Sequence, residues 1–397
     1  MICPANSDSV EMGHSGASRR LEPHMSSTNR QLIQVVARLQ PTRCGVSDYA
    51  VLLAQELESS FGIDTAFVVV NSTEPCESRF PRVYCAQSQL LEACTSLTNG
   101  QPGTLLIQLS GYGFSGDGAP LVLAGALAKV RESGRFQIAA YFHELFATAM
   151  PWKSAFWHSK RQQRAINAIA EQCDLLVTNL QPHADWLERN TMRRSAFPIQ
   201  LLPVSSNVGE TCVPAPMTGR KPAMVVFGMA ATRQRAYQRL SALKVLLGDL
   251  GVEEIVDVGP ELNVPPDVHG IPVTRKGILS AADIGLLLSD SRFGFVPHLP
   301  HALAKSGIFA GYCALGSIPV IPESFLGEVD GLKDGVHMVS PGTAKAALAD
   351  GLEHCSTAAW SWYTGHRLHV HAETFARLFA PSAVEKNLEA VNGRQGC

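Results

Sequence analysis

The feature that most constrains the fold is an alternation of short apolar runs with helix-patterned segments, which occurs in both halves of the 397-residue chain. Each run has the length of a strand and is rich in Val, Ile, Leu and Phe. Runs that are apolar throughout are typical of parallel strands covered by helices on both faces. The predicted strands are 32–39, 65–70, 104–109, 136–142, 174–178 and 199–204 in the first half, and 223–228, 253–259, 293–297 and 318–321 in the second.

Between these runs, apolar residues recur at the spacing of an α-helix. The predicted helices are 49–60, about 119–131, a long helix ending near 173, a helix from about 182, 235–249, and 280–290 with Ser280 as its N-cap. Strands and helices that alternate in this way predict an α/β protein built from two Rossmann-like domains. Ligands of such domains bind beyond the carboxyl ends of the strands.

A stretch rich in proline and glycine at 206–222 predicts the linker between the two domains. We expect an N-terminal Rossmann-like domain at 31–205 and a C-terminal one at 223–355, followed by two or three helices within 356–397. Residues 1–30 are polar and lack an apolar stretch, so we expect a disordered leader and no secretory signal.

The composition argues against several classes of function. A net charge of −2 gives no support to nucleic acid or an anionic membrane as the main partner. No run of eighteen apolar residues predicts a transmembrane helix. The ten cysteines are scattered without a CxxC pair, which favours a reduced, cytoplasmic protein without a structural metal.

Polar residues follow two of the predicted strands in the first half. Gly45 permits a close backbone approach, and Ser47 or Asp48 could cap the next helix, so this turn either touches a phosphate or sugar or is an ordinary capped turn. His143 and Glu144 follow the strand at 136–142, where His143 could bind a sugar hydroxyl or act as a base near neutral pH. Glu144 is a candidate for the same catalytic role, or it could orient His143. The alternative is a partly buried polar pair.

The segment 108–120 contains four glycines and two aromatic residues after another predicted strand. Such a loop could cover a cleft, with Tyr112 and Phe114 stacked on a sugar. The alternative is a connecting loop whose aromatic side chains fill the core.

In the second half, the predicted strand at 223–228 ends at Gly228 and is followed by Arg233 and Arg235. Arginines at this point can bind a diphosphate with their forked guanidinium groups. The alternative is that both are solvated side chains on a helix surface.

Lys305, Ser306 and Gly307 precede an apolar helix that Gly316 is expected to end. The amino end of a helix carries about half a positive charge and amide groups without partners. Lys305 adds a full charge, Ser306 a hydroxyl, and Gly307 removes a side chain that would block approach. This combination predicts an anion pocket, and the alternative is a Ser-capped helix with a solvated lysine.

In this order along the chain, the pieces resemble the GT-B glycosyltransferases, which have two Rossmann-like domains and use nucleotide-diphospho-sugars. The resemblance covers about residues 31–390. It rests on CGVSDYAVLLAQEL (44–57), YFHE (141–144), CDLLVTN (173–179), VVFG (225–228), IVDVGP (255–260), KGILSAADIGLLL (276–288), ALGSIPVI (314–321) and EVDGLKDGVHMVSP (328–341).

The resemblance implies a donor site in the second domain, an acceptor site in the first, and C-terminal helices that cross back to the first domain. Arg233 or Arg235, with Lys305 and Ser306, would contact the diphosphate, and Gly45 would face it. His143 would lie beside the transferred sugar, and a loop at 274–279 would lie near the base. One departure is that many retaining members carry a Glu-x7-Glu pair, and the matching positions here are Leu303 and Gly311.

The expected function is transfer of a sugar from a nucleotide-diphosphate donor to a hydroxyl acceptor, with no further cofactor. If the reaction inverts the sugar, His143 or Asp48 is the candidate base. The resemblance alone suggests exopolysaccharide or surface-glycan synthesis, a glycan or lipid-linked acceptor, and peripheral membrane contact. Two alternatives stay open, a nucleotide-sugar epimerase of the same fold and a protein that binds a nucleotide sugar without turnover.

Overall fold

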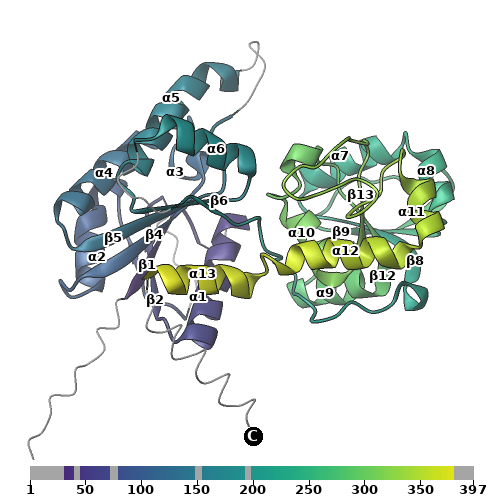
Figure 1. Cartoon of the computed structure of the whole chain (residues 1–397), viewed down its shortest axis with the longest axis horizontal. Coiled ribbons are helices and arrows are strands. Elements are labelled where there is room, and N and C mark those ends of the chain that lie inside the picture. Colours follow the sequence, from purple (N-terminus) through teal and green to yellow (C-terminus); the bar gives the residue numbers. More distant parts are fainter. Residues whose placement is uncertain (1–30, 40–44, 72–78, 148–153, 193–197, 380–397) are drawn as a thin grey trace, which may run out of the picture.

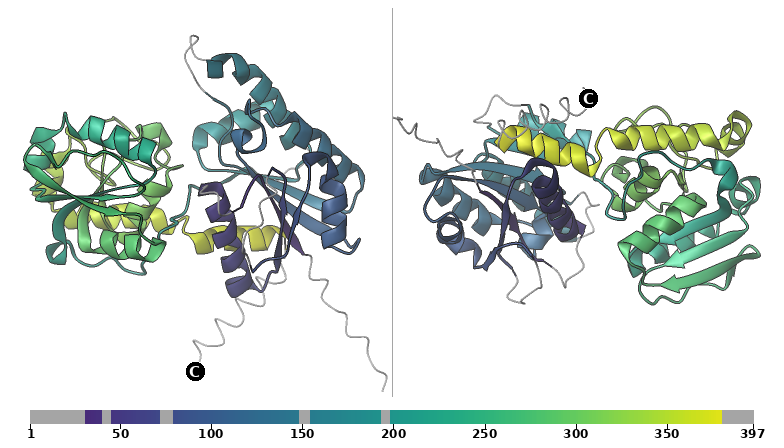
Figure 2. Two further views of the ribbon diagram at one scale, coloured as in Figure 1. Left: turned by 180° about the vertical axis from the view of Figure 1, so that it is seen from behind. Right: turned by 90° about the horizontal axis from the view of Figure 1, so that it is seen from below.

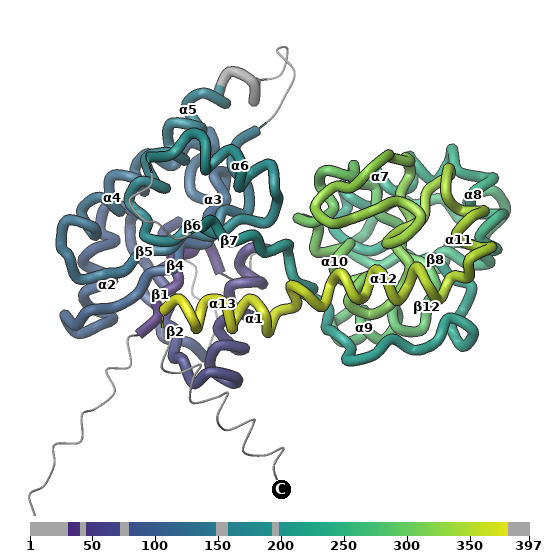
Figure 3. The backbone as a smooth tube through the Cα atoms, in the orientation of Figure 1, coloured from purple at the N-terminus to yellow at the C-terminus, as the bar shows by residue number. Residues whose placement is uncertain are grey.

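The computed structural model describes residues 31–39, 45–71, 79–147, 154–192 and 198–379. They form two sheets of mainly parallel strands, each with helices on both faces, which lie side by side in Figure 1. The α/β architecture with two Rossmann-like domains is therefore confirmed. The tube in Figure 3 shows the chain passing from one half to the other after β7 and again between α12 and α13.

The first sheet has the strand order β3-β2-β1-β4-β5-β6-β7, and all neighbouring pairs are parallel. Its strands are β1 (Leu32–Val36), β2 (Thr65–Val69), β3 (Arg82–Tyr84), β4 (Gly103–Leu109), β5 (Phe136–Phe142), β6 (Leu175–Thr178) and β7 (Gln200–Leu201). Its helices are α1 (Gly45–Phe61), α2 (Leu90–Leu97), α3 (Gly111–Phe114), α4 (Leu121–Glu132), α5 (Ser154–Ala170) and α6 (Gln181–Asn190).

The second sheet has the order β10-β11-β9-β8-β12-β13 and is parallel except for the edge pair β10–β11. Its strands are β8 (Lys221–Phe227), β9 (Glu254–Val258), β10 (Asp267–Val268), β11 (Ile271–Gly277), β12 (Ser291–Phe295) and β13 (Ile318–Val320). The remaining helices are α7 (Ala230–Leu240), α8 (Lys244–Asp249), α9 (Ala281–Asp290), α10 (Gly307–Leu315), α11 (Ala344–Asp350), α12 (Leu352–Thr364) and α13 (Leu368–Phe379).

The last two helices cross from the second sheet to the first, as the resemblance implied (Figures 1 and 2). α12 packs on the second domain, whereas Phe375 and Phe379 of α13 share a core with Leu53 and Leu57 of α1. Helices α2, α4 and α5 cover the opposite face of the first sheet. The first domain therefore has one of its faces completed by the last helix that the structure describes.

The two segments in which the chain crosses between the domains are joined by hydrogen bonds. The Tyr363 hydroxyl accepts a hydrogen bond from the Ser206 amide at 2.9 Å and donates to the Glu210 carboxylate. The same carboxylate accepts from the Leu368 amide at 2.9 Å. Because Ser206 and Glu210 lie in the stretch that leaves the first sheet, both passages between the domains meet at one point.

Several local predictions need correction. The helix expected at 49–60 begins at Gly45, so Ser47 and Asp48 lie within its first turn, and Ser47 donates to the Arg38 carbonyl instead of capping the helix. The predicted loop at 274–279 is strand β11 as far as Gly277. The helix expected at 235–249 is interrupted between α7 and α8.

The end signals of two helices are confirmed. Ser280 caps α9 by accepting from the Asp283 amide, and Gly316 ends α10 in the left-handed region at φ 73°. A Cβ at Gly316 would lie 2.4 Å from Pro214, so glycine is required there for space as well as for conformation. The predicted disordered leader at 1–30 and the end of the tail, 380–397, lie outside the described residues.

Candidate ligand-binding cleft

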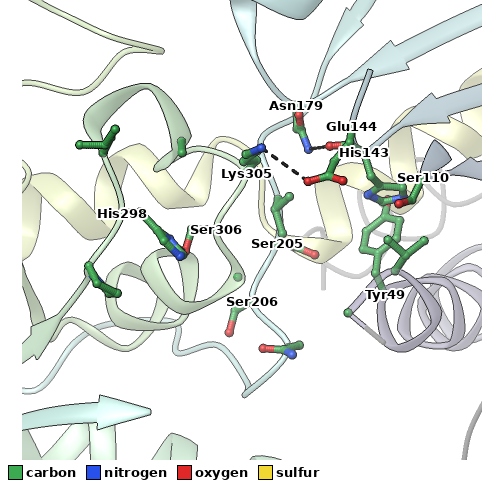
Figure 4. Close-up of a pocket in the computed structure, with 18 of the residues that line it drawn as sticks. Tyr49, Ser110, His143, Glu144, Asn179, Ser205, Ser206, His298, Lys305 and Ser306 are labelled. Carbon is green, nitrogen blue, oxygen red and sulfur yellow. Dashed lines mark hydrogen bonds and ion pairs between the residues drawn. The ribbon is translucent and has the colours of Figure 1, made fainter. Parts of the chain in front are cut away.

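Two adjoining cavities lie between the domains, with volumes of about 910 and 1160 Å³. Figure 4 shows a pocket at this position, lined from both halves of the chain. The cavities share Gly45 of the first domain and His298, Lys305, Ser306 and Gly307 of the second. Because they share these residues, the two cavities form one continuous cleft.

The topology explains why the cleft lies here. In the first sheet the chain reverses its direction of winding between β1 and β4, and in the second between β8 and β12. Ligands of open α/β sheets bind at such reversal points, beyond the carboxyl ends of the strands. Gly45 and Ser110 follow β1 and β4, and Gly228 and His298 follow β8 and β12, so both reversal points open into the same cleft.

The amino end of α10 faces this cleft and is arranged to receive an anion. The Ser306 hydroxyl accepts from the Phe309 amide at 3.2 Å and so caps the helix. The amides of Gly307 and Ile308 come earlier in the first turn, where a helix offers no internal acceptor. A Cβ at Gly307 would find its nearest neighbour 3.9 Å away, so the space beside the helix end is open.

Lys305 reaches the cleft from the same turn and pairs with Glu144 across it. The Lys305 Nζ lies 3.6 Å from the Glu144 Oε1, as the dashed line in Figure 4 shows. The two side chains are 34% and 55% exposed, respectively. Exposed ion pairs contribute little net free energy. A strongly charged ligand can therefore replace Glu144 as the partner of Lys305 at a small cost in free energy.

His298 is a cleft residue that is not among those predicted from the sequence. Its Nδ1 lies 3.0 Å from the Ser306 Oγ. Burial, together with the charges of Arg235 and Lys305, lowers the pKa of His298 to about 4. His298 is therefore neutral at pH 7, and its Nδ1 either accepts a hydrogen bond from the Ser306 hydroxyl or donates one to it. A polar residue directly after a buried strand, as in FVPH, was the available signal.

Removing the cap of α10 has a measurable cost. We expect Ser306→Ala to lower the free energy of unfolding by about 1 kcal/mol, because the Phe309 amide loses its partner. Chemical denaturation measures this loss. The matched variant Ser280→Ala removes the cap of α9 and is expected to cost a similar amount. If Ser306→Ala left the free energy of unfolding unchanged, the capping geometry would be contradicted.

His143 lies at the end of β5 and lines the same cavity as Glu144. Its Nε2 is 2.8 Å from the Gln108 Oε1, and its ring packs against Tyr141 with centroids 4.1 Å apart. Burial lowers the pKa of His143 to about 3, with a smaller contribution from His371. His143 is thus neutral at pH 7 and suited to accept a hydrogen bond, whereas its low pKa makes it a weak base.

The two predicted arginines have different surroundings. Arg235 is exposed and lines the cavity beside His298. Arg233 is 1% exposed, and its guanidinium binds the Asp257 carboxylate and the carbonyls of Gly228 and Pro260. The structure therefore gives Arg233 a role in the core instead of the predicted diphosphate contact, which stays a prediction for Arg235.

Two further predicted residues lie away from both cavities. Phe114 is buried in the core of the first domain, which is the alternative stated for this loop. Tyr112 is half exposed, and its hydroxyl accepts from Gln162 at 3.0 Å. Neither lines the cleft, so stacking on a sugar is not supported in this arrangement. Asp48 does line the cleft, in the cavity that also contains Gly228.

The positions that match the Glu-x7-Glu pair are inside the protein. Leu303 is 1% exposed, and a Cβ at Gly311 would lie 2.9 Å from the Val208 side chain. Because a methyl group of Val208 occupies the space at Gly311, a carboxylate does not fit there unless the Val208 side chain moves. The cleft is therefore built without this acidic pair.

Two features of the described part of the chain concern metals and membranes. Within it, no group of three or more His, Cys, Asp or Glu residues is placed to hold a metal ion. None of its helices is long and apolar enough to cross a membrane.

No protein-family model matches the sequence. No curated protein matches it either. Several solved structures are similar in fold. A trehalose-6-phosphate protein from E. coli bound with UDP-2-fluoro glucose has a TM-score of 0.53 and 12% identity, covering 87% of this chain and 98% of its own.

A pneumococcal O-GlcNAc transferase in complex with UDP and GlcNAc has a TM-score of 0.53 and 8% identity, covering 90% of this chain and 99% of its own. A protein from Listeria monocytogenes described as a UDP-N-acetylglucosamine 2-epimerase has a TM-score of 0.53 and 11% identity, covering 88% of this chain and 96% of its own. These likenesses confirm the predicted GT-B fold, with two Rossmann-like domains facing across a cleft.

Proposed function

We propose that this protein binds a nucleotide-diphosphate sugar in the interdomain cleft and transfers the sugar to a hydroxyl acceptor. The observation that carries the proposal is the convergence of Lys305, Ser306, Arg235 and the first amides of α10 on one cavity. Two cations and unpaired amides suit a diphosphate, which carries about two charges and several acceptor oxygens.

The part of the cleft beyond α10 supports a site for the nucleoside. It is lined by apolar side chains at the carboxyl ends of β8, β9 and β11, among them Val258, Ile278 and Leu279. Gly228 and Gly259 lie at the same edge with φ of 131° and 149°. A Cβ at Gly259 would lie 2.3 Å from the Gly228 carbonyl oxygen, so glycine is required there by the close packing of this edge. Residues 278 and 279 belong to the segment that the resemblance implies near the base.

In this proposal the donor's diphosphate is the leaving group, and its developing charge is stabilised by Lys305, Arg235 and the amino end of α10. Such preorganised donors act most strongly where water is excluded. His143 would offer a neutral acceptor to a sugar hydroxyl. The candidate base would be Glu144, which is exposed beside Lys305, or Asp48 in the adjoining cavity.

We also propose a hydroxyl acceptor that is a glycan or lipid-linked sugar, used in the cytoplasm for exopolysaccharide or surface-glycan synthesis. Peripheral contact with a membrane belongs to this proposal. Its support is the resemblance of the motifs to glycan-assembling GT-B enzymes.

A thermal-shift screen against UDP, ADP, GDP, CDP and TDP tests donor binding, because a ligand of the native state raises the melting temperature. We expect one or two of these nucleotides to raise it. The matching nucleotide sugars are then incubated with the protein, with and without a sugar acceptor. Absence of a shift with every nucleotide would contradict the proposed donor site.

A second candidate is epimerisation of a nucleotide sugar, because a 2-epimerase shares the fold over 88% of this chain. An epimerase converts the donor without an acceptor, so product analysis separates the two reactions. A third is binding without turnover, which the apolar residues at Leu303 and Gly311 favour. Conversion of any bound nucleotide sugar would exclude it.

A further inference from the structure

Two buried glutamines interrupt the apolar strands of the first sheet. Gln34 of β1 and Gln108 of β4 are 0% and 1% exposed, yet they lie in the sequences LIQVV and LLIQL. Side chains alternate along a strand, so both amides point to the face covered by α1. A buried amide must be hydrogen-bonded, because leaving it unpaired costs about 1–3 kcal/mol.

The two amides form a chain of hydrogen bonds that ends at His143. The Gln34 Nε2 donates to the Ala50 carbonyl at 2.9 Å. The Gln108 Nε2 donates to the Gln34 Oε1 at 2.6 Å. The Gln108 Oε1 lies 2.8 Å from the His143 Nε2.

The direction of this chain is fixed at its first member. A backbone carbonyl can only accept, so Gln34 must present its NH2 group to Ala50 and its oxygen to Gln108. Gln108 must then turn its own NH2 group to Gln34 and its oxygen to His143. Only a protonated Nε2 can complete the chain.

Other contacts fix the backbone of His143 without offering its ring a different hydrogen-bond partner. The His143 amide donates to the Leu109 carbonyl at 2.9 Å, and the His143 carbonyl accepts from Asn179 at 3.0 Å. The neighbouring hydroxyls are used elsewhere, since Tyr49 bonds His371 and Tyr141 donates to the Leu202 carbonyl. Within the described residues, the Nδ1 of His143 has no hydrogen-bond partner, and His143 lines the cleft.

We propose that Gln34 and Gln108 are positioning residues that hold His143 as the Nε2–H tautomer, so that its Nδ1 lone pair faces the cleft as an acceptor. The tautomer follows from the hydrogen-bond chain alone. The use of Nδ1 to orient a sugar hydroxyl rests on the proposed function.

The test is nuclear magnetic resonance of the full chain labelled with 15N-histidine, at pH 7.5 and without ligand. Correlations between ring nitrogens and ring protons distinguish the two neutral tautomers. His143→Asn identifies the signals by their disappearance. We expect the wild-type protein to show the Nε2–H form alone.

The variants separate the hydrogen-bond chain from general packing. We expect Gln108→Leu to give a mixture with the Nδ1–H form, because Nε2–H loses its acceptor. Gln34→Leu is expected to do the same, since the Gln108 amide can then rotate. Thr104→Val is the matched control, because it removes a buried hydroxyl of β4 that has no partner and should leave the tautomer unchanged.

An Nδ1–H form in the wild-type protein would overturn the proposal, and this measurement does not depend on whether the leucine variants fold. Unchanged tautomers in folded Gln108→Leu and Gln34→Leu would overturn it equally. These outcomes are distinguishable from failure of the proposed function, because the tautomer is read without nucleotide. An Nε2–H form in a protein that binds no nucleoside diphosphate would sustain the positioning role and contradict the function alone.

Discussion

Lys305→Ala is expected to weaken the binding of the preferred nucleoside diphosphate by about 10- to 150-fold. A hydrogen bond to a charged group contributes about 1.5–3 kcal/mol, and 1.4 kcal/mol corresponds to a tenfold change in affinity. Lys305 lies at the amino end of α10, where its charge adds to that of the helix. Isothermal titration calorimetry of the wild-type and variant proteins measures the difference.

Lys333→Ala is the matched control. Lys333 belongs to the same domain and, like Lys305, pairs loosely with a glutamate, with its Nζ 3.2 Å from Glu328. Lys333 does not line the cleft, so its removal should leave affinity unchanged. Glu144→Gln frees Lys305 from its partner and is expected to leave affinity equal or higher. Equal binding by Lys305→Ala and wild type would show that the diphosphate is not held at α10.

Arg233→Met is expected to lower the free energy of unfolding by about 3–5 kcal/mol, the cost of leaving one charge of a buried ion pair without its partner. Arg233 and Asp257 are both almost fully buried. The second oxygen of Asp257 accepts from the Tyr237 hydroxyl at 3.0 Å, which does not replace a positive charge. Urea denaturation gives the free energy of unfolding.

Arg235→Met serves as the comparison, because Arg235 lies on the same helix but is exposed. Its effect on unfolding should stay within about 0.5 kcal/mol. The double variant Arg233→Met/Asp257→Leu removes both charges and is expected to recover much of the lost stability. If Arg233 were a diphosphate ligand, Arg233→Met would instead weaken nucleotide binding and leave stability nearly unchanged.

The central strands were predictable, and so were the edge strands β7 and β13, whereas β3, β10 and β11 were not. β4 and β5 are buried throughout or nearly so, and their apolar runs mark them within one residue. β3 and β11 lie at or next to a sheet edge, and their side chains are partly or fully exposed. An exposed strand need not be apolar, so RVY and IPVTRKG carry no comparable signal.

For the cleft, sequence position indicated the correct strand ends. It could not show which of two neighbouring side chains faces the cleft and which faces the core. Arg233 and Arg235 are two residues apart, so on a helix of 3.6 residues per turn they face different sides. Which of them faces the cleft depends on Asp257, which lies on strand β9 and binds Arg233. Gln34 and Gln108 did carry a signal, because a polar residue within a buried strand requires a partner.

The position of α13 has a consequence for synthesis of the chain. Part of the apolar side of α1, with Leu53 and Leu57, packs on the sheet, and part is covered by residues of α13, which are made more than three hundred positions later. At ribosomal speeds of about 5–20 residues per second, the part of α1 that α13 covers stays exposed for on the order of ten seconds or more. The nascent protein must therefore avoid aggregation through this apolar surface until α13 emerges. Chains terminated before α13 would keep the surface exposed.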